Sequence, residues 1–312
     1  MSGACVFRGG YGRGYPAVLL LVLLMLICGQ AIASLPSYHE VKDAYRASDV
    51  RVLDRDGQLL QRVRRDYEGR RRDWIALDDI SPALQSAVIF SEDRRFYSHS
   101  GVDWEAVAAA AWGNVWHDQH RGASTISMQL VALLGAEYRR GRSGRTWMQK
   151  IGQAAEARDL DRDWTKPQIL EAYLNLVAFR GELVGVDALA RVLFQKHPNG
   201  LDAREAAVAA ALLRGPNASR AVLTQRACGL LADLNVPQEC RGLSDFIYRS
   251  LLHKSARRAD TDSLAPHYAR LVLERHPLAA GQSVRTSIDV ALHRDVMDSV
   301  DRHVRALQAS NV

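Results

Sequence analysis

The sequence is poor in aromatic residues and in cysteines, and it contains no low-complexity linker and no internal repeat. Phe, Trp and Tyr make up only 7% of the 312 residues, and neither a nucleic-acid-binding motif nor a zinc-ligand spacing is present. We therefore expect no nucleic-acid partner, although the formal net charge is +6 and arginines gather at 62–72 and 139–145. The basic clusters favour an anionic lipid or a phosphate-bearing substrate instead. A hydrophobic content of 47% is typical of a folded globular protein.

Only four cysteines are present, and none stands at a metal-ligand spacing. Cys5 and Cys28 lie in the N-terminal segment, whereas Cys228 and Cys240 lie in the body of the chain. In an oxidising compartment the latter two could form a disulfide. The sequence is equally compatible with two free thiols.

The sequence also lacks a clean apolar run of full membrane-spanning length. Two arginines precede the apolar run Ala17–Cys28, and the residues that follow, up to Leu35, weaken the pattern. Residues 1–35 are interpreted either as a signal peptide cleaved at Ala31-x-Ala33 or as a retained signal-anchor. Both interpretations place the rest of the chain outside the cytoplasm, since basic residues that precede an apolar run stay inside.

Residues 36–80 are mixed and polar, and we interpret them as a connector that contains a β-hairpin. Apolar residues around Val50 and Val63 flank Asp56-Gly57, a pair that is typical of tight hairpin turns. After residue 80 the spacing of apolar residues is almost wholly helical. Near the C-terminus, residues 283–296 are predicted to form a short strand that leads into a helix.

An acidic pair, Glu92-Asp93, stands at the end of a helix that Ser81 is predicted to cap. The apolar stripe of this helix leads to the pair, so we expect Glu92 to face a cleft wall or the core, and the helix to end near Phe96. Partial burial favours the protonated carboxyl group, which suits a general base or acid. The alternative is a structural role in which the neighbouring arginines and His99 neutralise both acids.

A turn of small residues precedes a helix that is predicted to start near Ile126. Gly122, Ser124 and Thr125 in this turn leave backbone N–H groups available for an anion such as a phosphate. The alternative is that the two hydroxyl side chains only cap the helix.

Two further predicted helices carry polar side chains on one face. Lys150 and Gln153 share a face of the first helix. A capping box that starts at Thr165 opens the second helix, where Glu171 and Asn175 lie on a face different from the apolar one.

Taken in order, these segments resemble the peptidoglycan glycosyltransferases of glycosyltransferase family 51. This family comprises the glycan-polymerising modules of class A penicillin-binding proteins and the monofunctional transglycosylases. SEDRRFYSHSG (91–101) resembles the first family motif, and GASTISMQL (122–130) resembles the second. Lys150 falls within the third motif, ILEAYLN (169–175) matches the fourth, and Arg226 with Leu230-Leu231 fits the fifth.

The resemblance implies a mostly α-helical, lysozyme-like fold with a head lobe and a membrane-proximal jaw lobe. It places the glycosyltransferase domain at 81–240 and the protein at the bacterial inner membrane, with the catalytic domain on the periplasmic side. The implied reaction joins lipid II to a growing glycan chain through a β-1,4 link and releases undecaprenyl diphosphate. Proteins of cell-wall synthesis or division are further expected partners.

The resemblance also implies roles for individual residues. Glu92 would be the general base that removes the proton of the acceptor hydroxyl, and Asp93 would support it. A divalent cation, Mg²⁺ or Mn²⁺, could accompany the donor pyrophosphate, and no metal-ligating residue is assigned. The substrate-binding positions carried over are Phe96, His99, Gly122, Ser124, Thr125, Gln129, Lys150, Gln153, Glu171, Asn175 and Arg226.

The sequence departs from the family pattern at several positions. Gln153 stands where most members have a second functional glutamate, and Leu176 and Arg180 replace the usual Arg and Gly. Met128 and the stretch FRGELVG (179–185) resemble the 1C-type branch of class A penicillin-binding proteins.

The extension 241–312 resembles the start of a linker to a transpeptidase domain, and no Ser-x-x-Lys, Ser-x-Asn or Lys-Thr-Gly set follows. A polymerase is therefore the leading hypothesis for the function. The missing transpeptidase motifs and Gln153 favour a catalytically weak, lipid II-binding scaffold as the alternative. A glycan-cleaving, lysozyme-like enzyme is the third candidate.

Overall fold

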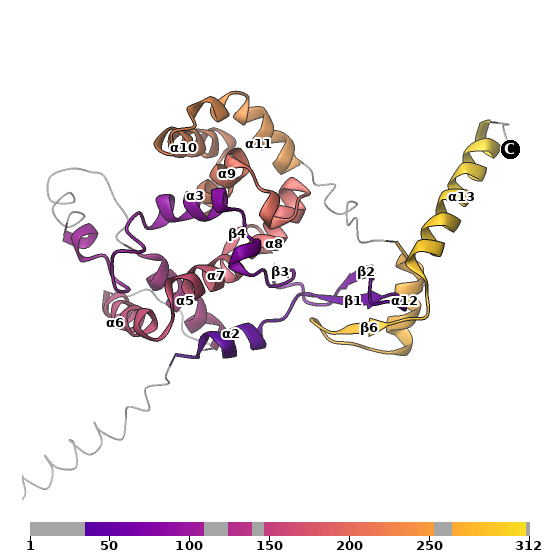
Figure 1. Cartoon of the computed structure of the whole chain (residues 1–312), viewed down its shortest axis with the longest axis horizontal. Helices are drawn as coiled ribbons and strands as arrows, with labels where there is room; N and C mark the ends of the chain where they lie inside the picture. The colour runs from indigo at the N-terminus through magenta and orange to yellow at the C-terminus, as the bar shows by residue number, and fades with distance from the viewer. Residues whose placement is uncertain (1–34, 109–123, 139–146, 253–263, 310–312) are drawn as a thin grey trace, which may run out of the picture. The chain divides into compact units, whose positions relative to one another are not determined.

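The computed structural model describes residues 35–108, 124–138, 147–252 and 264–309 (Figure 1). The chain divides into two compact units, Met1–Pro36 and Ser37–Val312, and the elements named below lie in the second. Helices dominate the described part of this unit, which confirms the mostly α-helical class. The predicted signal peptide or anchor lies, except for Leu35, outside the described residues.

Among the helices described, none combines the length and the apolar character that crossing a membrane requires.

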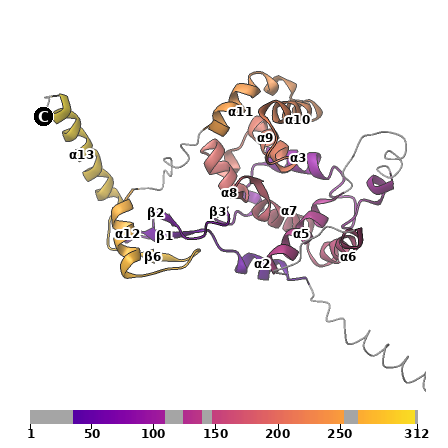
Figure 2. The same ribbon diagram turned by 180° about the vertical axis from the view of Figure 1, so that it is seen from behind.

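The core is formed by long helices, of which α7 is buried along most of its length. Every side chain of α7 from Ile169 to Leu176 is buried, so the polar face predicted for Glu171 and Asn175 is buried as well. Helix α7 packs on α5 and α5 packs on α6, while α9 contacts both α3 and α10 (Figure 1, Figure 2). These helices are α3 (Pro82–Glu92), α5 (Ile126–Tyr138), α6 (Trp147–Asp163), α7 (Lys166–Leu176), α9 (Ala203–Leu213) and α10 (Arg220–Asp233).

The described chain also contains other α-helices and two small sheets. The helices are α2 (Tyr38–Ala44), α8 (Val186–Leu189), α11 (Leu243–Leu252), α12 (Pro266–Arg275) and the longer α13 (Val290–Ala309). The strands are β1 (Asp49–Leu53), β2 (Leu59–Arg64), β3 (Arg70–Arg71), β4 (Ala178–Arg180), β5 (Leu183–Val184) and β6 (Ser283–Arg285).

The core helices begin where the sequence predicts because polar side chains satisfy their first N–H groups. The Ser81 hydroxyl accepts a hydrogen bond from the backbone N–H of Ala83 at the start of α3. Thr165 and Gln168 form the reciprocal capping box of α7, and Asp202 opens α9 in the same way.

The predicted hairpin is present, and it is part of a larger sheet. Strands β1 and β2 pair antiparallel around Gly57, whose φ of +86° is the left-handed conformation that favours glycine. Strand β6 then pairs parallel with β1. The buried carboxylate of Asp54 accepts hydrogen bonds from the turn N–H of Gln58 (2.7 Å) and from Val290 N–H at the start of α13 (3.4 Å). The connector and the C-terminal extension therefore form one sheet, which the sequence pattern did not predict.

A disulfide joins Cys228 in α10 to Cys240, with the two Cα atoms 5.1 Å apart. This separation is within the usual range for disulfides. The bond closes the end of α10 onto the short turn Pro237–Cys240, and it settles the alternative that the sequence left open.

Candidate functional site

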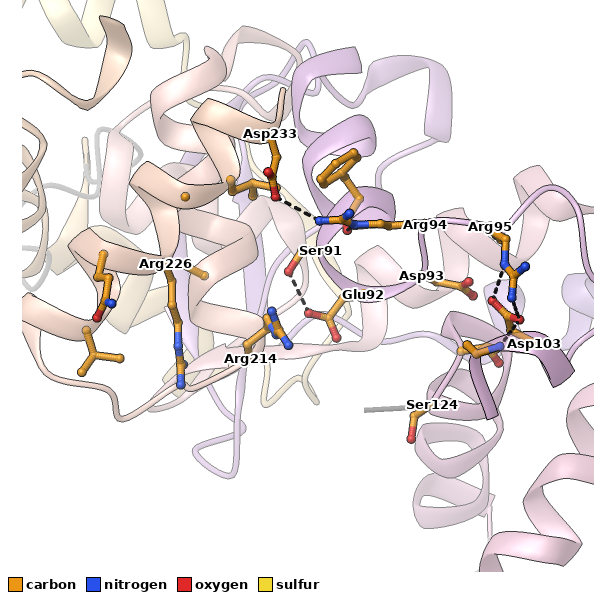
Figure 3. Close-up of a pocket in the computed structure, with 18 residues that line it drawn as sticks. Ser91, Glu92, Asp93, Arg94, Arg95, Asp103, Ser124, Arg214, Arg226 and Asp233 are labelled. Atoms are coloured by element: carbon orange, nitrogen blue, oxygen red, sulfur yellow. Dashed lines mark hydrogen bonds and ion pairs between the residues drawn. The ribbon is translucent and has the colours of Figure 1, made fainter. Parts of the chain in front are cut away.

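A cleft of about 970 Å³ opens between α3, the start of α5 and the pair α9–α10 (Figure 3). Its lining is rich in charged side chains, which suits a charged substrate rather than an apolar one. The charged and hydroxyl-bearing residues that line it are Ser91, Glu92, Asp93, Arg94, Arg95, Asp103, Ser124, Thr125, Arg214, Arg226 and Asp233.

Glu92 presents a half-exposed carboxylate to this cleft from the last position of α3. The Ser91 hydroxyl donates to Glu92 Oε1 (3.1 Å), and the Gln129 side-chain amide donates to Glu92 Oε2 (3.1 Å). Gln129 is oriented in turn by the buried Tyr173, whose hydroxyl donates to Gln129 Oε1 (2.9 Å). Burial, together with the charge of Glu92, raises the pKa of the Tyr173 hydroxyl, so it stays a donor. The carboxylate is thus held in place and remains open to a substrate.

Asp93 has a different environment, although it neighbours Glu92. It is buried, and its carboxylate lies 2.9 and 3.0 Å from His99 Nε2. It also accepts a hydrogen bond from the backbone N–H of Ile126 (3.0 Å), at the start of α5. These contacts draw Asp93 out of helical geometry, so α3 ends at Glu92 and the prediction of an end near Phe96 is wrong.

The structural alternative for the acidic pair therefore applies to Asp93 and not to Glu92. Arg94 pairs with Asp233 (2.9 Å) on α10, and Arg95 pairs with Asp103 and with a neighbouring exposed acid. Neither arginine neutralises Glu92 within the described chain.

Phe96 and His99 lie behind the cleft wall. The Phe96 ring is fully buried, and Lys166 Nζ lies 4.6 Å from its centroid. The side chain of His99 is largely buried through its contact with Asp93, and its Nδ1 has no hydrogen-bond partner among the described residues. His99 therefore holds Asp93, and the Phe96 ring packs next to the His99 ring, with centroids 6.5 Å apart.

The turn before α5 divides its two hydroxyl side chains between different roles. Thr125 is buried, donates to the carbonyl of Gly101 (2.5 Å) and accepts from the backbone N–H of Met128 (3.2 Å). It therefore caps α5, as the alternative proposed. Ser124 is exposed and lines the cleft, and Gly122 lies outside the described residues.

The structure describes only part of the third motif. Lys150 lies in α6, and its side chain falls outside the described part of the structure. Gln153 is half-buried on α6 and is not among the described residues that line the cleft.

Glu171 and Asn175 lie away from the cleft and bind the segment that precedes α3. The Glu171 carboxylate accepts hydrogen bonds from Trp74 Nε1 (2.6 Å), from the N–H of Leu77 (2.8 Å), and from Tyr38 and Lys42 of α2. The Asn175 amide bonds both backbone groups of Ile75, at 2.9 and 2.8 Å. That the two residues share a face different from the apolar one was predicted, but the partners from 38–77 were not.

The stability of the protein is expected to depend on the charge of Glu171. Burial alone would raise its pKa, but the hydrogen bonds from Tyr38, Trp74, Leu77 and Lys42 lower the pKa below the ordinary value of 4.5. The stabilisation is therefore present above about pH 4.5 and is lost as the pH falls through the lowered folded-state pKa. We expect Glu171→Gln to reduce the free energy of unfolding at pH 7 by about 2–4 kcal/mol. Urea denaturation should show this difference from the wild type shrinking below pH 4.5. A difference that stays constant between pH 7 and pH 3 would contradict the assignment.

Arg226, for which the resemblance implies substrate binding, lines the cleft from α10, and Arg214 joins it from the end of α9. The sequence reading missed Arg214 because a basic residue at a helix C-terminus is ordinarily explained by the helix dipole. It also missed Tyr173, which looked like a core residue only.

No three His, Cys, Asp or Glu side chains of the described chain gather in a way that could hold a metal ion. A divalent cation bound with the donor pyrophosphate stays a prediction.

Comparison with known proteins shows similarity to transglycosylases. The family model described as "Transglycosylase" matches residues 56–234. A "Biosynthetic peptidoglycan transglycosylase" of Rhodospirillum centenum is 42% identical over 147 residues, which cover 46% of this chain and 61% of that protein. A protein of the same name from Mannheimia succiniciproducens is 40% identical over 144 residues, covering 46% and 57%. "Penicillin-binding protein 2D" of Bacillus subtilis is 26% identical over 256 residues, covering 76% and 36%.

The match with the two biosynthetic transglycosylases spans 57–61% of their length, so it does not carry their whole activity over to this protein. The family assignment is firmer, because the matched residues 56–234 make up more than half of the chain. They include the whole of α3, α5, α7, α9 and α10 up to Asp233, and with them the described cleft. The chain belongs to the transglycosylase family.

Proposed function

We propose that this protein is a peptidoglycan glycosyltransferase that polymerises lipid II into β-1,4-linked glycan strands and releases undecaprenyl diphosphate. One observation carries the proposal. Among the described residues that line the cleft, Glu92 is the one carboxylate without a basic side chain bound to it, and it faces the open space. Asp93, Asp103 and Asp233 are each paired with a basic residue.

In this reaction Glu92 takes the proton from the 4-hydroxyl of the acceptor's terminal N-acetylglucosamine. The hydroxyl oxygen then attacks the anomeric carbon of the donor chain, and the carbon–oxygen bond to the pyrophosphate breaks. The leaving group takes the electron pair, and because the hydroxyl oxygen attacks from the face opposite to it, the configuration at this carbon is inverted. Ser91 and Gln129 orient the carboxylate through their hydrogen bonds, and basic side chains stabilise the charge that develops on the pyrophosphate.

The finer assignments belong to the same proposal. The helices would form the head lobe of a lysozyme-like fold, with a jaw lobe next to the bilayer. The segment 1–35 would direct the chain through the bacterial inner membrane, and catalysis would take place on the periplasmic side. Lipid II and the growing glycan would be its ligands, and other cell-wall synthesis proteins would be its partners. The relatives named biosynthetic peptidoglycan transglycosylases support this setting.

The test is to incubate the detergent-solubilised full chain with fluorescent lipid II and to separate the products on a gel. A ladder of glycan chains that lysozyme digests to disaccharide units is the expected result. Release of muropeptides from isolated cell-wall sacculi, without chain formation, would contradict the proposal and favour a glycan-cleaving enzyme.

A lipid II-binding scaffold with little activity is the second candidate. It is favoured by Gln153, which cannot titrate and carries no charge where most resembling sequences have a glutamate. Binding of lipid II without any polymer, even at high protein concentration, would support the scaffold. Restoration of polymer by Gln153→Glu would then identify this position as the cause.

A further inference from the structure

Two arginines in the cleft are left without an acidic partner after the other charges are paired. Arg94 binds Asp233, and Arg95 binds Asp103. No ion pair to Arg214 or Arg226 occurs within the described chain, and both side chains are exposed. In the view of Figure 3, both arginines lie to one side of Glu92, and Ser124 lies to the other. The α9–α10 wall therefore offers two guanidinium groups to a ligand.

The guanidinium group of Arg226 lies against the backbone next to Arg214. A Cβ atom placed on Gly215 would be 2.5 Å from Arg226 Nη1, and the methyl carbon of Ala218 lies close by. The missing side chain at 215 thus leaves the space that Arg226 occupies. Because Gly215 directly follows Arg214, the turn between α9 and α10 places both arginines on one wall.

A third arginine, Arg180, forms hydrogen bonds with this turn. Arg180 of β4 donates through Nη1 to the carbonyl oxygens of Pro216 (2.8 Å) and Ala218 (3.4 Å). These carbonyls lie in the short connection between the end of α9 and the start of α10. Position 180 is usually glycine in the sequences that this chain resembles, and glycine could not make either contact. Arginine at position 180 therefore stabilises the turn that follows Arg214 through two hydrogen bonds that glycine could not form.

We propose that Arg214 and Arg226 together bind the pyrophosphate of a lipid-linked substrate, and that Arg180 is a positioning residue for them. The proposal rests on the proposed function, which requires a pyrophosphate in this cleft. The planar fork of a guanidinium group matches the oxygens of a phosphate, and two such groups match the two phosphates of a pyrophosphate. Hydrogen bonds between charged groups are also stronger than neutral ones.

The first test measures binding of farnesyl pyrophosphate to the full chain in detergent by isothermal titration calorimetry. Inorganic pyrophosphate and farnesol are titrated separately, so that a lipid-linked ligand is distinguished from a free anion. We expect Arg214→Ala to weaken binding of farnesyl pyrophosphate about 10–100-fold, with partial recovery in Arg214→Lys. Arg204→Ala and Arg220→Ala are matched controls on α9 and α10, since neither residue lines the cleft, and they should bind as the wild type does.

The second test separates positioning from folding. Arg180→Gly should weaken binding in the wild-type background and should add no further loss when Arg214 and Arg226 are already alanine. Gly215→Ala should also weaken binding, because the new methyl group displaces the Arg226 guanidinium rather than backbone. Its melting temperature should stay close to that of the wild type.

The inference would be overturned if Arg214→Ala bound farnesyl pyrophosphate with the affinity of the wild type. It would also be overturned if Arg180→Gly lowered the affinity equally in the wild type and in the variant that lacks both Arg214 and Arg226. The outcome for the proposed function is separate. If the wild type makes glycan strands while Arg214→Ala binds farnesyl pyrophosphate normally, the subsite is wrong and the function stands. If binding requires Arg214 but the wild type makes no polymer, the subsite stands and the function is wrong.

Discussion

Glu92→Gln is expected to slow the formation of glycan strands by roughly 10²–10⁴-fold, the usual contribution of a general base. Gln has the same shape as Glu and can still accept a hydrogen bond from the Gln129 amide, but it cannot take up the proton of the acceptor hydroxyl. Because the Glu92 side chain is half-exposed and binds no cation in the described chain, the free energy of unfolding should change by less than about 0.5 kcal/mol. The initial rate with fluorescent lipid II and a thermal melt of the same preparation measure both quantities.

Asp93→Asn is the control that separates chemistry from architecture. Its carboxylate is buried between His99 and the backbone of Ile126, so the substitution should lower the melting temperature as well as the rate. A Glu92→Gln variant that keeps more than a tenth of the wild-type rate would rule out Glu92 as the base. A variant that loses both rate and stability would assign Glu92 a structural role instead.

Gly101→Ala is expected to destabilise the folded protein by about 2–6 kcal/mol. Gly101 has a φ of +79°, which costs another residue about 1–3 kcal/mol of backbone strain. A Cβ atom at this position would also lie 2.7 Å from the backbone nitrogen of Arg158 and closer still to the carbonyl oxygen of Ala157. Those atoms belong to helix α6 and cannot move aside as a flexible side chain would, which adds about 1–3 kcal/mol. Urea denaturation at neutral pH measures the loss.

The matched control for this prediction is Gly181→Ala. Gly181 also has a positive φ, +57°, but a Cβ atom there would meet nothing within 4 Å. Its loss of stability should therefore be limited to the strain, about 1–3 kcal/mol. Equal losses at the two positions would show that the close approach of Gly101 to α6 carries no extra cost. The carbonyl oxygen of Gly101 also accepts a hydrogen bond from the Thr125 hydroxyl. Gly101→Ala, unlike Gly181→Ala, should therefore also loosen the start of α5.

The local elements of this protein were accessible from its sequence because their signals lie within a few neighbouring residues. The Ser81 cap, the capping box at Thr165 and the Asp56-Gly57 turn each lie where the pattern predicts them. The acidic pair was also recognised, and Glu92 does face a cleft. The end of α3 was predicted too late, because Asp93 is held by Ile126, 33 positions along the chain, as well as by the nearby His99.

The sequence could not show which polar residues are structural and which line the cleft, since each role depends on partners distant in the chain. Glu171 and Asn175 look like site residues in a motif, but they are bound by side chains and backbone from 38–77. Thr125 and Ser124 are adjacent in sequence and both line the cleft, yet Thr125 is buried and caps α5, whereas Ser124 is exposed.

The sequence by itself determined the helical class, the family resemblance and the identity of the candidate base, because helix periodicity, caps and short motifs are local properties of the chain. The tertiary structure alone decided that Arg214 and Arg226 share one wall of the cleft, that Arg180 braces this wall, and that strand β6 completes the sheet begun by the hairpin. These arrangements join residues from about a dozen to more than two hundred positions apart, and packing, not local spacing, brings such residues together.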